Sequence, residues 1–151
     1  MMSRALGILG LARKAGALEI GEESAGIAAR SRKARAFLTA QDASGNTVRR
    51  IENFASISGL PHLALPYTKD ELGDALGVRA CAALAFTNAG LAANFTEKLE
   101  AEFPGQYTQP LEFLRLKAEK IEQRKKEARA HERNVRTGRA SSKQKGRKMN
   151  G

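Results

Sequence analysis

The stretch GEESAGIAAR, residues 21–30, follows a short apolar segment at residues 17–20 and decides how the chain is organised. A glycine at this point, followed by residues that favour helix, predicts a strand that turns directly into a helix. The first N–H groups of such a helix lack partners within it, and with the positive end of the helix dipole they favour an anion such as a phosphate. In the alternative interpretation, Gly21 supplies only the turn, and Glu22 and Glu23 only complement the dipole.

Positive charge is distributed unevenly along the 151 residues, which carry a formal charge of +10. Residues 1–110 contain 12 Lys or Arg and 11 Asp or Glu, whereas residues 111–151 contain 14 and 5. We therefore expect a nearly neutral globular part and a strongly basic tail. Such a tail favours a polyanionic partner, nucleic acid first and an anionic membrane surface second.

Short apolar segments alternate with helical patterns over the first hundred residues. The segments lie at residues 17–20, 36–40, 61–66 and 81–87, and helices are expected after Ser3, Gly21, Thr47, Thr68 and Asn88. Strands that are apolar almost throughout belong to a sheet covered on both faces. The pattern predicts an α/β fold, a three-layer α/β/α sandwich with a mixed sheet of about four strands.

Local signals set the ends of several helices. Ser3 and Asn88 are predicted N-caps, Thr68 and Glu71 have the spacing of a capping box, and Gly16 is placed where a helix C-terminal glycine is expected. Residues 42–47 are dense in side chains that bond their own backbone, so a turn is expected there, with the next helix following it.

The C-terminal third is predicted to lie outside the sandwich. Pro104, Gly105 and Pro110 interrupt the pattern, and after them an apolar helical face fades beyond Ile121. Residues from about 137 onward have no apolar period, so disorder is expected. The predicted organisation is a domain at residues 1–104, a linker and basic helix at 105–136, and a disordered basic tail at 137–151.

The sequence has no recognisable catalytic or metal-binding pattern. It contains no Walker loop and no dinucleotide-binding glycine motif, and His62, Cys81 and His131 lack the spacing of metal ligands. We expect no catalysis, no cofactor and no metal, and a structural role for His62. The single cysteine excludes an internal disulfide and fits a cytoplasmic location, and no segment is long enough to span a membrane.

Five short motifs, in order, resemble the kink-turn-binding family of ribosomal proteins. They are LGLARKAG at residues 9–16, GEE at 21–23, DASGNT at 42–47, Leu72-Gly73 and Gly77-Val78-Arg79. This family includes the archaeal large-subunit protein L-seven-Ae and small bacterial homologues, which the chain resembles most. The resemblance covers residues 4 to about 103.

The resemblance implies an α/β/α fold that binds sharply bent RNA without catalysis. Family members insert the helix that opens at a glycine into the widened groove of an RNA internal loop with sheared G·A pairs. Apolar and basic residues elsewhere cover an extruded base and hold the backbone, a division of roles that suits structured RNA. The RNA-binding residues implied for this chain are Gly21, Glu22, Glu23, Ser24, Ser44, Lys69, Val78 and Arg79.

The chain departs from the family pattern at Ile27 and in the loop after Gly77, which is one residue shorter than in eukaryotic members, and several alternatives stay open. The family commonly has a lysine at the position of Ile27. Val78 could be a core residue, and Lys69 and Arg79 could be solvated surface charges. The function predicted from the sequence is RNA binding in the ribosome or another ribonucleoprotein, with RNA and ribosomal proteins as partners and no membrane. The alternatives are a protein-interaction module on a ribosomal-protein fold and an RNA-recognition subunit for a separate RNA-modifying enzyme.

Overall fold

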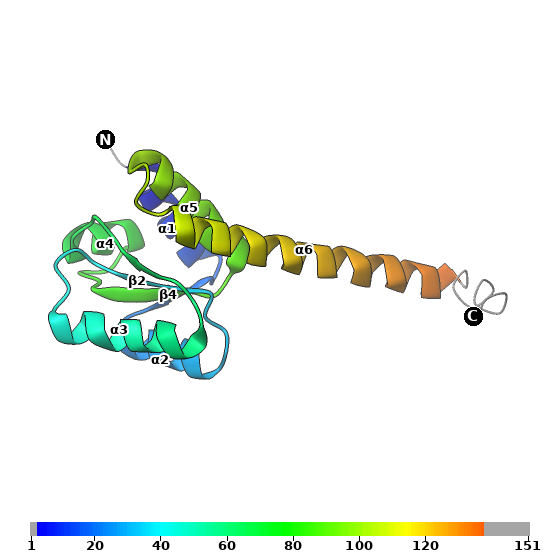
Figure 1. Cartoon of the computed structure of the whole chain (residues 1–151), viewed down its shortest axis with the longest axis horizontal. Coiled ribbons are helices and arrows are strands. Elements are labelled where there is room, and N and C mark those ends of the chain that lie inside the picture. Colours follow the sequence, from blue (N-terminus) through cyan, green and yellow to red (C-terminus); the bar gives the residue numbers. More distant parts are fainter. Residues whose placement is uncertain (1–2, 138–151) are drawn as a thin grey trace. The chain divides into compact units, whose positions relative to one another are not determined.

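The structure is a computed structural model that describes residues 3–137 and alternates helices with short strands. Figure 1 labels most of these elements along the chain. The strands are β1 (Leu18–Ile20), β2 (Ala36–Thr39), β3 (His62–Ala64) and β4 (Ala83–Phe86). The helices are α1 (Arg4–Lys14), α2 (Glu22–Arg30), α3 (Gly45–Ser58), α4 (Lys69–Leu76), α5 (Ala89–Glu102) and α6 (Thr108–Thr137).

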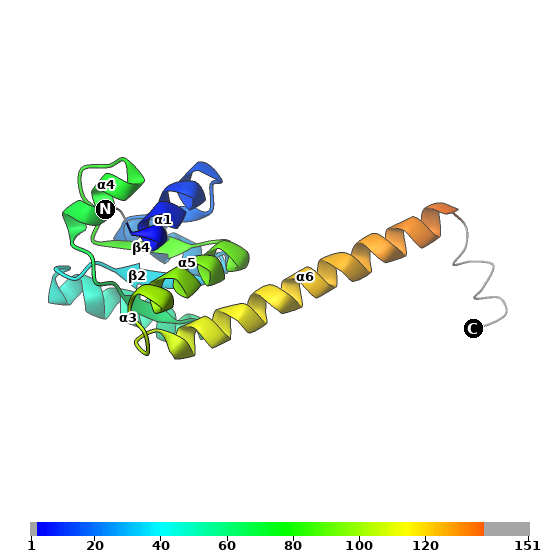
Figure 2. The same cartoon turned by 90° about the horizontal axis from the view of Figure 1, so that it is seen from above.

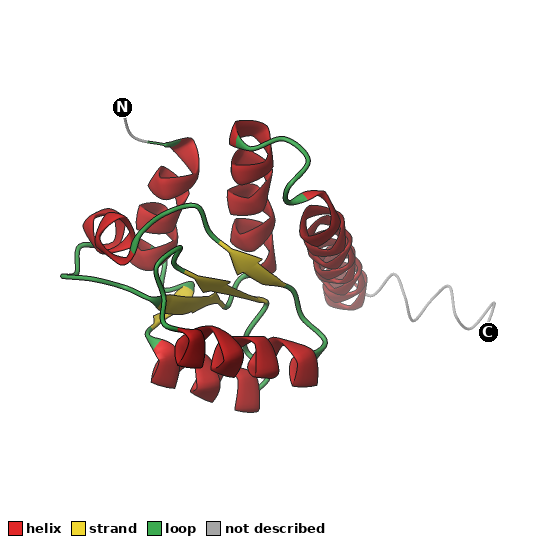
Figure 3. Cartoon of the chain, turned by 60° about the vertical axis from the view of Figure 1, so that its left-hand side comes forward, coloured by secondary structure: helices red, strands yellow, loops and turns green. Residues whose placement is uncertain are grey.

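The four strands form one mixed sheet in the order β1-β4-β2-β3. β4 is antiparallel to both β1 and β2, and β2 is parallel to β3. Helices α2 and α3 lie on one face of this sheet, and α1, α4 and α5 lie on the other (Figures 1 and 3). The predicted α/β/α sandwich with a mixed four-stranded sheet is therefore confirmed.

The buried strands contribute side chains to two separate cores because side chains alternate between the faces of a sheet. Leu38 and Leu84 are paired in register and pack in the core beneath α1, α4 and α5, which appear on the near side of the sheet in Figure 2. Phe37 and Ala85, the adjacent pair, pack in the core beneath α2 and α3. Since both faces are covered, an almost continuous apolar sequence is the expected composition for β2 and β4.

The predicted helix ends are confirmed at the caps, whereas two helix starts differ from prediction. Ser3, Asn88 and the Thr68–Glu71 capping box form the expected bonds. α3 begins at Gly45, within the expected turn, because the Ser44 hydroxyl accepts a hydrogen bond from the Thr47 amide and acts as its N-cap. α6 begins before Pro110, which occupies the first helical turn, where a missing N–H removes no helical bond.

The connection between α5 and α6 is organised by one carboxylate. Glu100 accepts hydrogen bonds from the amides of Gly105 and Tyr107, at 2.6 and 2.7 Å, and these bonds lower the pKa of Glu100. The Tyr107 hydroxyl in turn donates to the carbonyl of Ala64 at 2.8 Å. The start of α6 is thereby fixed to the last residue of β3.

The compact unit extends to Leu116, and the described residues after it, 117–137, belong to a separate unit. Leu111 and Leu114 are buried, so the first turns of α6, which the sequence assigns to a linker and basic helix, pack with the sandwich. From Lys117 to Arg136, α6 carries eight Lys or Arg and four Glu. The tail predicted to be disordered lies almost wholly beyond the described residues. Between residues 3 and 137, no helix is long and apolar enough to cross a membrane.

The environment of His62 predicts how stability depends on pH. Nε2 of His62 lies 2.8 Å from Oγ1 of the buried Thr39, and burial lowers the pKa of the imidazole more than the carboxylate of Glu52 raises it. Just below pH 6.5, the unfolded chain therefore binds more protons than the folded chain, so acidification through this range reduces the free energy of unfolding. Urea unfolding between pH 7.5 and 5.5 should show this loss, and H62Q should show a smaller one. Equal pH dependence in the two proteins would show that His62 does not cause the loss of stability.

Candidate nucleic-acid interface

Strand direction brings three helix starts to one edge of the sheet. Because β1, β2 and β3 run the same way, their carboxyl ends share an edge, and α2, α3 and α4 begin just beyond it. β4 runs the opposite way, so the loop before it, residues 77–82, lies at the same edge. Segments that are distant in sequence, and that contain all eight predicted RNA-binding residues, therefore meet here.

Backbone hydrogen bonds hold these segments together. The Gly21 amide donates to the carbonyl of Ala83 at 2.8 Å, which joins the start of α2 to β4. The Lys69 amide donates to Oδ1 of Asp42 at 2.8 Å, and the Lys69 carbonyl accepts from the Cys81 amide at 3.0 Å. The start of α4 is thus fixed on one side to the loop before α3 and on the other to the loop before β4.

The N-terminus of α2 differs from those of α1, α3, α4 and α5 because no side chain caps it. Its N-cap is Gly21, at φ +102°, whereas Ser3, Ser44, Thr68 and Asn88 cap the other four helices with side-chain oxygens. No residue between 3 and 137 accepts a hydrogen bond from the amides of Glu22, Glu23 and Ser24. These amides and the helix dipole therefore remain available to an anion.

Glu22 joins α2 to α3. Its carboxylate accepts a hydrogen bond of 2.8 Å from the Thr47 hydroxyl and forms an ion pair with the Arg50 guanidinium at 2.5 Å. Both contacts lower the pKa of Glu22. The Arg50 guanidinium also lies 5.5 Å from the centre of the Phe54 ring. Glu22 thus has partners within the protein that join the start of α2 to α3, and its contact with RNA stays a prediction.

The loop that contains Val78 and Arg79 is held against α4 at a helical glycine. A Cβ at Gly73 would lie 2.7 Å from the carbonyl oxygens of both Val78 and Arg79, so no other residue fits without moving the loop. The Gly73 carbonyl accepts a hydrogen bond of 2.9 Å from the Val78 amide. Val78 is half-buried against the core, and Arg79 is exposed.

The other predicted residues lie at the same edge with different degrees of exposure. Glu23 and Lys69 are exposed, and Ser24 is half-buried. The Ser44 side chain is exposed, but its hydroxyl already caps α3. Ile27, which stands where the family has lysine, is 59% exposed and so lies outside the core.

The sequence interpretation missed residues that support this edge from other elements. The Arg13 guanidinium donates a hydrogen bond to the carbonyl of Leu76, the last residue of α4. With Lys14, Arg13 lines a hollow of about 450 Å³ beside Gly77. A basic residue in the last turn of a helix normally interacts with its own helix end, so no local signal would connect Arg13 to α4.

The described part of the chain contains no group of three or more His, Cys, Asp or Glu side chains arranged to hold a metal ion. The thiol of Cys81 is buried and donates to the carbonyl of Ala83 at 3.3 Å, and burial raises its pKa. Its neutral form is therefore favoured, as for a small buried side chain.

Comparison with solved structures shows that the fold is a known one. A protein of unknown function from Bacillus halodurans C has a TM-score of 0.62 and 21% sequence identity, with 66% of this chain and 99% of that chain covered. The 15.5kD RNA binding protein of Giardia lamblia has a TM-score of 0.54 and 20% identity, with coverage of 64% and 84%. No protein-family model matches the sequence, and no curated protein matches it. At these identities, the similarity concerns the fold.

The contact at Gly73 leads to a prediction about the loop. G73A would force the carbonyls of Val78 and Arg79 away from α4, and we expect a loss of about 1–3 kcal/mol in the free energy of unfolding, as for overpacked sites. G7A is the matched control, because Gly7 also lies within a helix but has open space around its Cβ position. G7A should instead gain about 0.5–1 kcal/mol from helix propensity. Urea unfolding measures both, and a stabilised G73A would contradict the close contact.

Proposed function

We propose that the chain is a non-enzymatic RNA-binding protein that recognises kink-turn-like RNA, in the ribosome or another cytoplasmic ribonucleoprotein. The observation that carries the proposal is the convergence of the uncapped start of α2, Lys69 and the Val78–Arg79 loop at one sheet edge. The fold shared with the Giardia lamblia RNA binding protein supports RNA as the ligand.

The edge offers different chemistry to different parts of an RNA. The amides of residues 22–24 suit a phosphate or a base-edge acceptor, and Lys69 and Arg79 suit the phosphate backbone. The exposed part of Val78 can cover an unpaired base. The carboxylate of Glu23 and the hydroxyl of Ser24 can bond to the exposed amino and imino groups of a distorted pair.

Kinked RNA satisfies these contacts better than a regular duplex. An A-form helix has a deep, narrow major groove that side chains cannot enter, so proteins recognise RNA sequence mainly where pairing is broken. A sharp bend with non-Watson–Crick pairs widens the groove and releases a base. The start of α2 could then approach base edges while Lys69 and Arg79 hold phosphates on either side.

The basic part of α6 provides a second, less selective contribution to the affinity for RNA. Lys and Arg side chains release counterions from RNA whatever its sequence, so they raise affinity for all RNAs together. Specificity is then left to the residues at the sheet edge.

The first test of the proposal compares three RNAs of equal length. A kink-turn RNA should bind more tightly than a plain duplex and than the same RNA with its G·A pairs replaced by Watson–Crick pairs. K69A/R79A should weaken binding to all three, because both residues are expected to contact phosphates. Equal affinity of the unmodified protein for the three RNAs at moderate salt would reject kink-turn recognition and favour the interaction-module alternative.

The second test removes the part of α6 beyond Leu116, together with the residues that follow it. A chain ending at Leu116 keeps the buried Leu111 and Leu114 and loses a net charge of +9. If the removed segment engages about five phosphates, the slope of log affinity against log salt should fall by about 4. The preference for kinked RNA should persist. Loss of that preference, with general affinity unchanged, would assign recognition to α6 and contradict the proposed site.

A further inference from the structure

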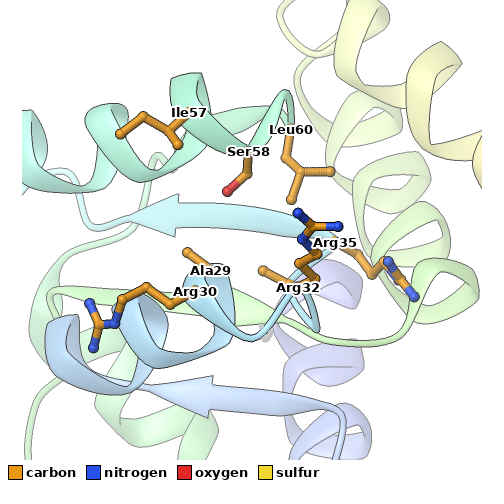
Figure 4. Close-up of a pocket in the computed structure, with 8 residues that line it drawn as sticks. Ala29, Arg30, Arg32, Arg35, Ile57, Ser58 and Leu60 are labelled. Carbon is orange, nitrogen blue, oxygen red and sulfur yellow. The ribbon is translucent and has the colours of Figure 1, made fainter.

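A groove lies at the opposite end of α2 from the proposed RNA-binding edge. It occupies about 540 Å³ between the last turn of α2, the turn that follows it, and the end of α3. A neighbouring hollow of about 240 Å³ continues it along α3 to Phe54. We call this the α2–α3 groove, and Figure 4 shows the side chains that line it: Ala29, Arg30, Arg32, Ala34, Arg35, Ile57, Ser58 and Leu60.

The arginine side chains of the groove do not cap the end of α2. The last carbonyls of α2, those of Ile27, Ala28 and Ala29, already accept hydrogen bonds from amides in the turn at residues 31–34. The Ser31 hydroxyl donates to the Ile27 carbonyl as well, at 2.9 Å. No hydrogen bond or ion pair joins the side chain of Arg30, Arg32 or Arg35 to any residue between 3 and 137. Capping of the helix therefore does not explain the cluster.

The groove concentrates positive charge without a counter-charge. Four cations fall within residues 30–35, three of them arginines that line the groove, and no acidic residue lines it. The carboxylate of Glu22, at the other end of α2, is bound to Thr47 and Arg50. Arg32 adopts the left-handed conformation, at φ +61°, which is uncommon outside glycine. An anion would relieve the repulsion between these guanidinium groups, and paired donors on Arg suit phosphate.

Apolar side chains lie between cations at the two ends of the groove. Figure 4 shows the Arg30 guanidinium on one side of Ala29 and those of Arg32 and Arg35 on the other. Arg30 lies back along α2, since its Nη1 is 3.3 Å from the position of a Cβ at Gly26. Ile57, which is 79% exposed, and the half-buried Leu60 belong to the opposite wall. A volume of about 540 Å³ exceeds what one phosphate needs and falls within the range of small-ligand sites.

We propose that the α2–α3 groove is a second RNA contact, which binds an unpaired nucleotide by its base and the phosphates on either side. The base packs against Ala29 and Ile57, while Arg30 holds one phosphate and Arg32 with Arg35 holds the next. A nine-residue helix spans about 14 Å, so one RNA molecule can reach both ends of α2. The RNA class rests on the proposed function, whereas the groove and its charge do not.

The test measures the affinity gained from a single-stranded extension. The full chain is titrated with a kink-turn RNA and with a plain duplex, each blunt or carrying six unpaired uridines at its 5′ or 3′ end. Stacking and phosphate contacts of one nucleotide predict that one of the extensions tightens binding at least about fivefold. R32Q/R35Q and I57A should each reduce this gain to less than twofold, while affinity for the blunt RNAs stays within twofold of the unmodified protein.

Matched controls isolate the groove from charge and folding. R4Q/K98Q removes the same charge from exposed or half-buried positions on α1 and α5, away from the groove, and should keep the gain from the extension. Urea unfolding of each variant confirms that it is folded, as expected since Arg32 and Ile57 are exposed.

Two outcomes would overturn the proposal. The first is an unchanged gain in R32Q/R35Q and I57A, or no gain in the unmodified protein. In the second, the unmodified protein binds a Glu- and Leu-rich peptide and both variants lose this binding, while the extended RNAs bind to all three proteins equally. That result would show that the groove binds a protein and not RNA. Failure of kink-turn recognition is a separate result, because the comparison of blunt and extended duplex tests the groove without it.

Discussion

Strand β4 sets the arrangement on which the rest of the structure depends. It is hydrogen-bonded to β1 on one side and to β2 on the other, and it runs against both. Its direction leaves the ends of β1, β2 and β3 at one edge, together with the loop that enters β4. Without this central antiparallel strand, the start of α2 and the Val78–Arg79 loop would have no reason to meet. Both faces of β4 are buried, which explains why its sequence, ALAF, contains no polar residue.

The two ends of α2 differ in how they present positive charge. At its start, the amides are left uncapped and the carboxylate of Glu22 is held by Thr47 and Arg50, so the positive end of the helix can face an anion. At its end, amides of the following turn satisfy the carbonyls, and Arg32 and Arg35 add positive charge beside the negative end of the dipole. Both ends can therefore attract a polyanion, the first through the backbone and the second through side chains.

Much of the fold was predictable because its signals are local. N-caps, the Thr68–Glu71 capping box and apolar strand segments depend on neighbours within a few residues, and each is confirmed. The start of α3 was misplaced because Ser44 is equally suited to a turn and to an N-cap. The buried Leu111 and Leu114 had the right spacing for a packed helix, but their contact with the sandwich depends on Tyr107 and on Glu100, which organises the turn.

The site was predictable only in part, since its decisive contacts join residues far apart in sequence. The pairing of Glu22 with Arg50 and the approach of residues 78–80 to Gly73 follow from the tertiary fold and from no local pattern. The basic run at residues 30–35 was visible in the sequence, but the hollow around it was not. Amide chemical shifts of the full chain, recorded while kink-turn RNA is added, show whether RNA binds at the sheet edge. Binding there predicts the largest changes at residues 22–24, at Lys69 and at residues 78–79. Changes confined to α6, with this edge unaffected, would contradict it.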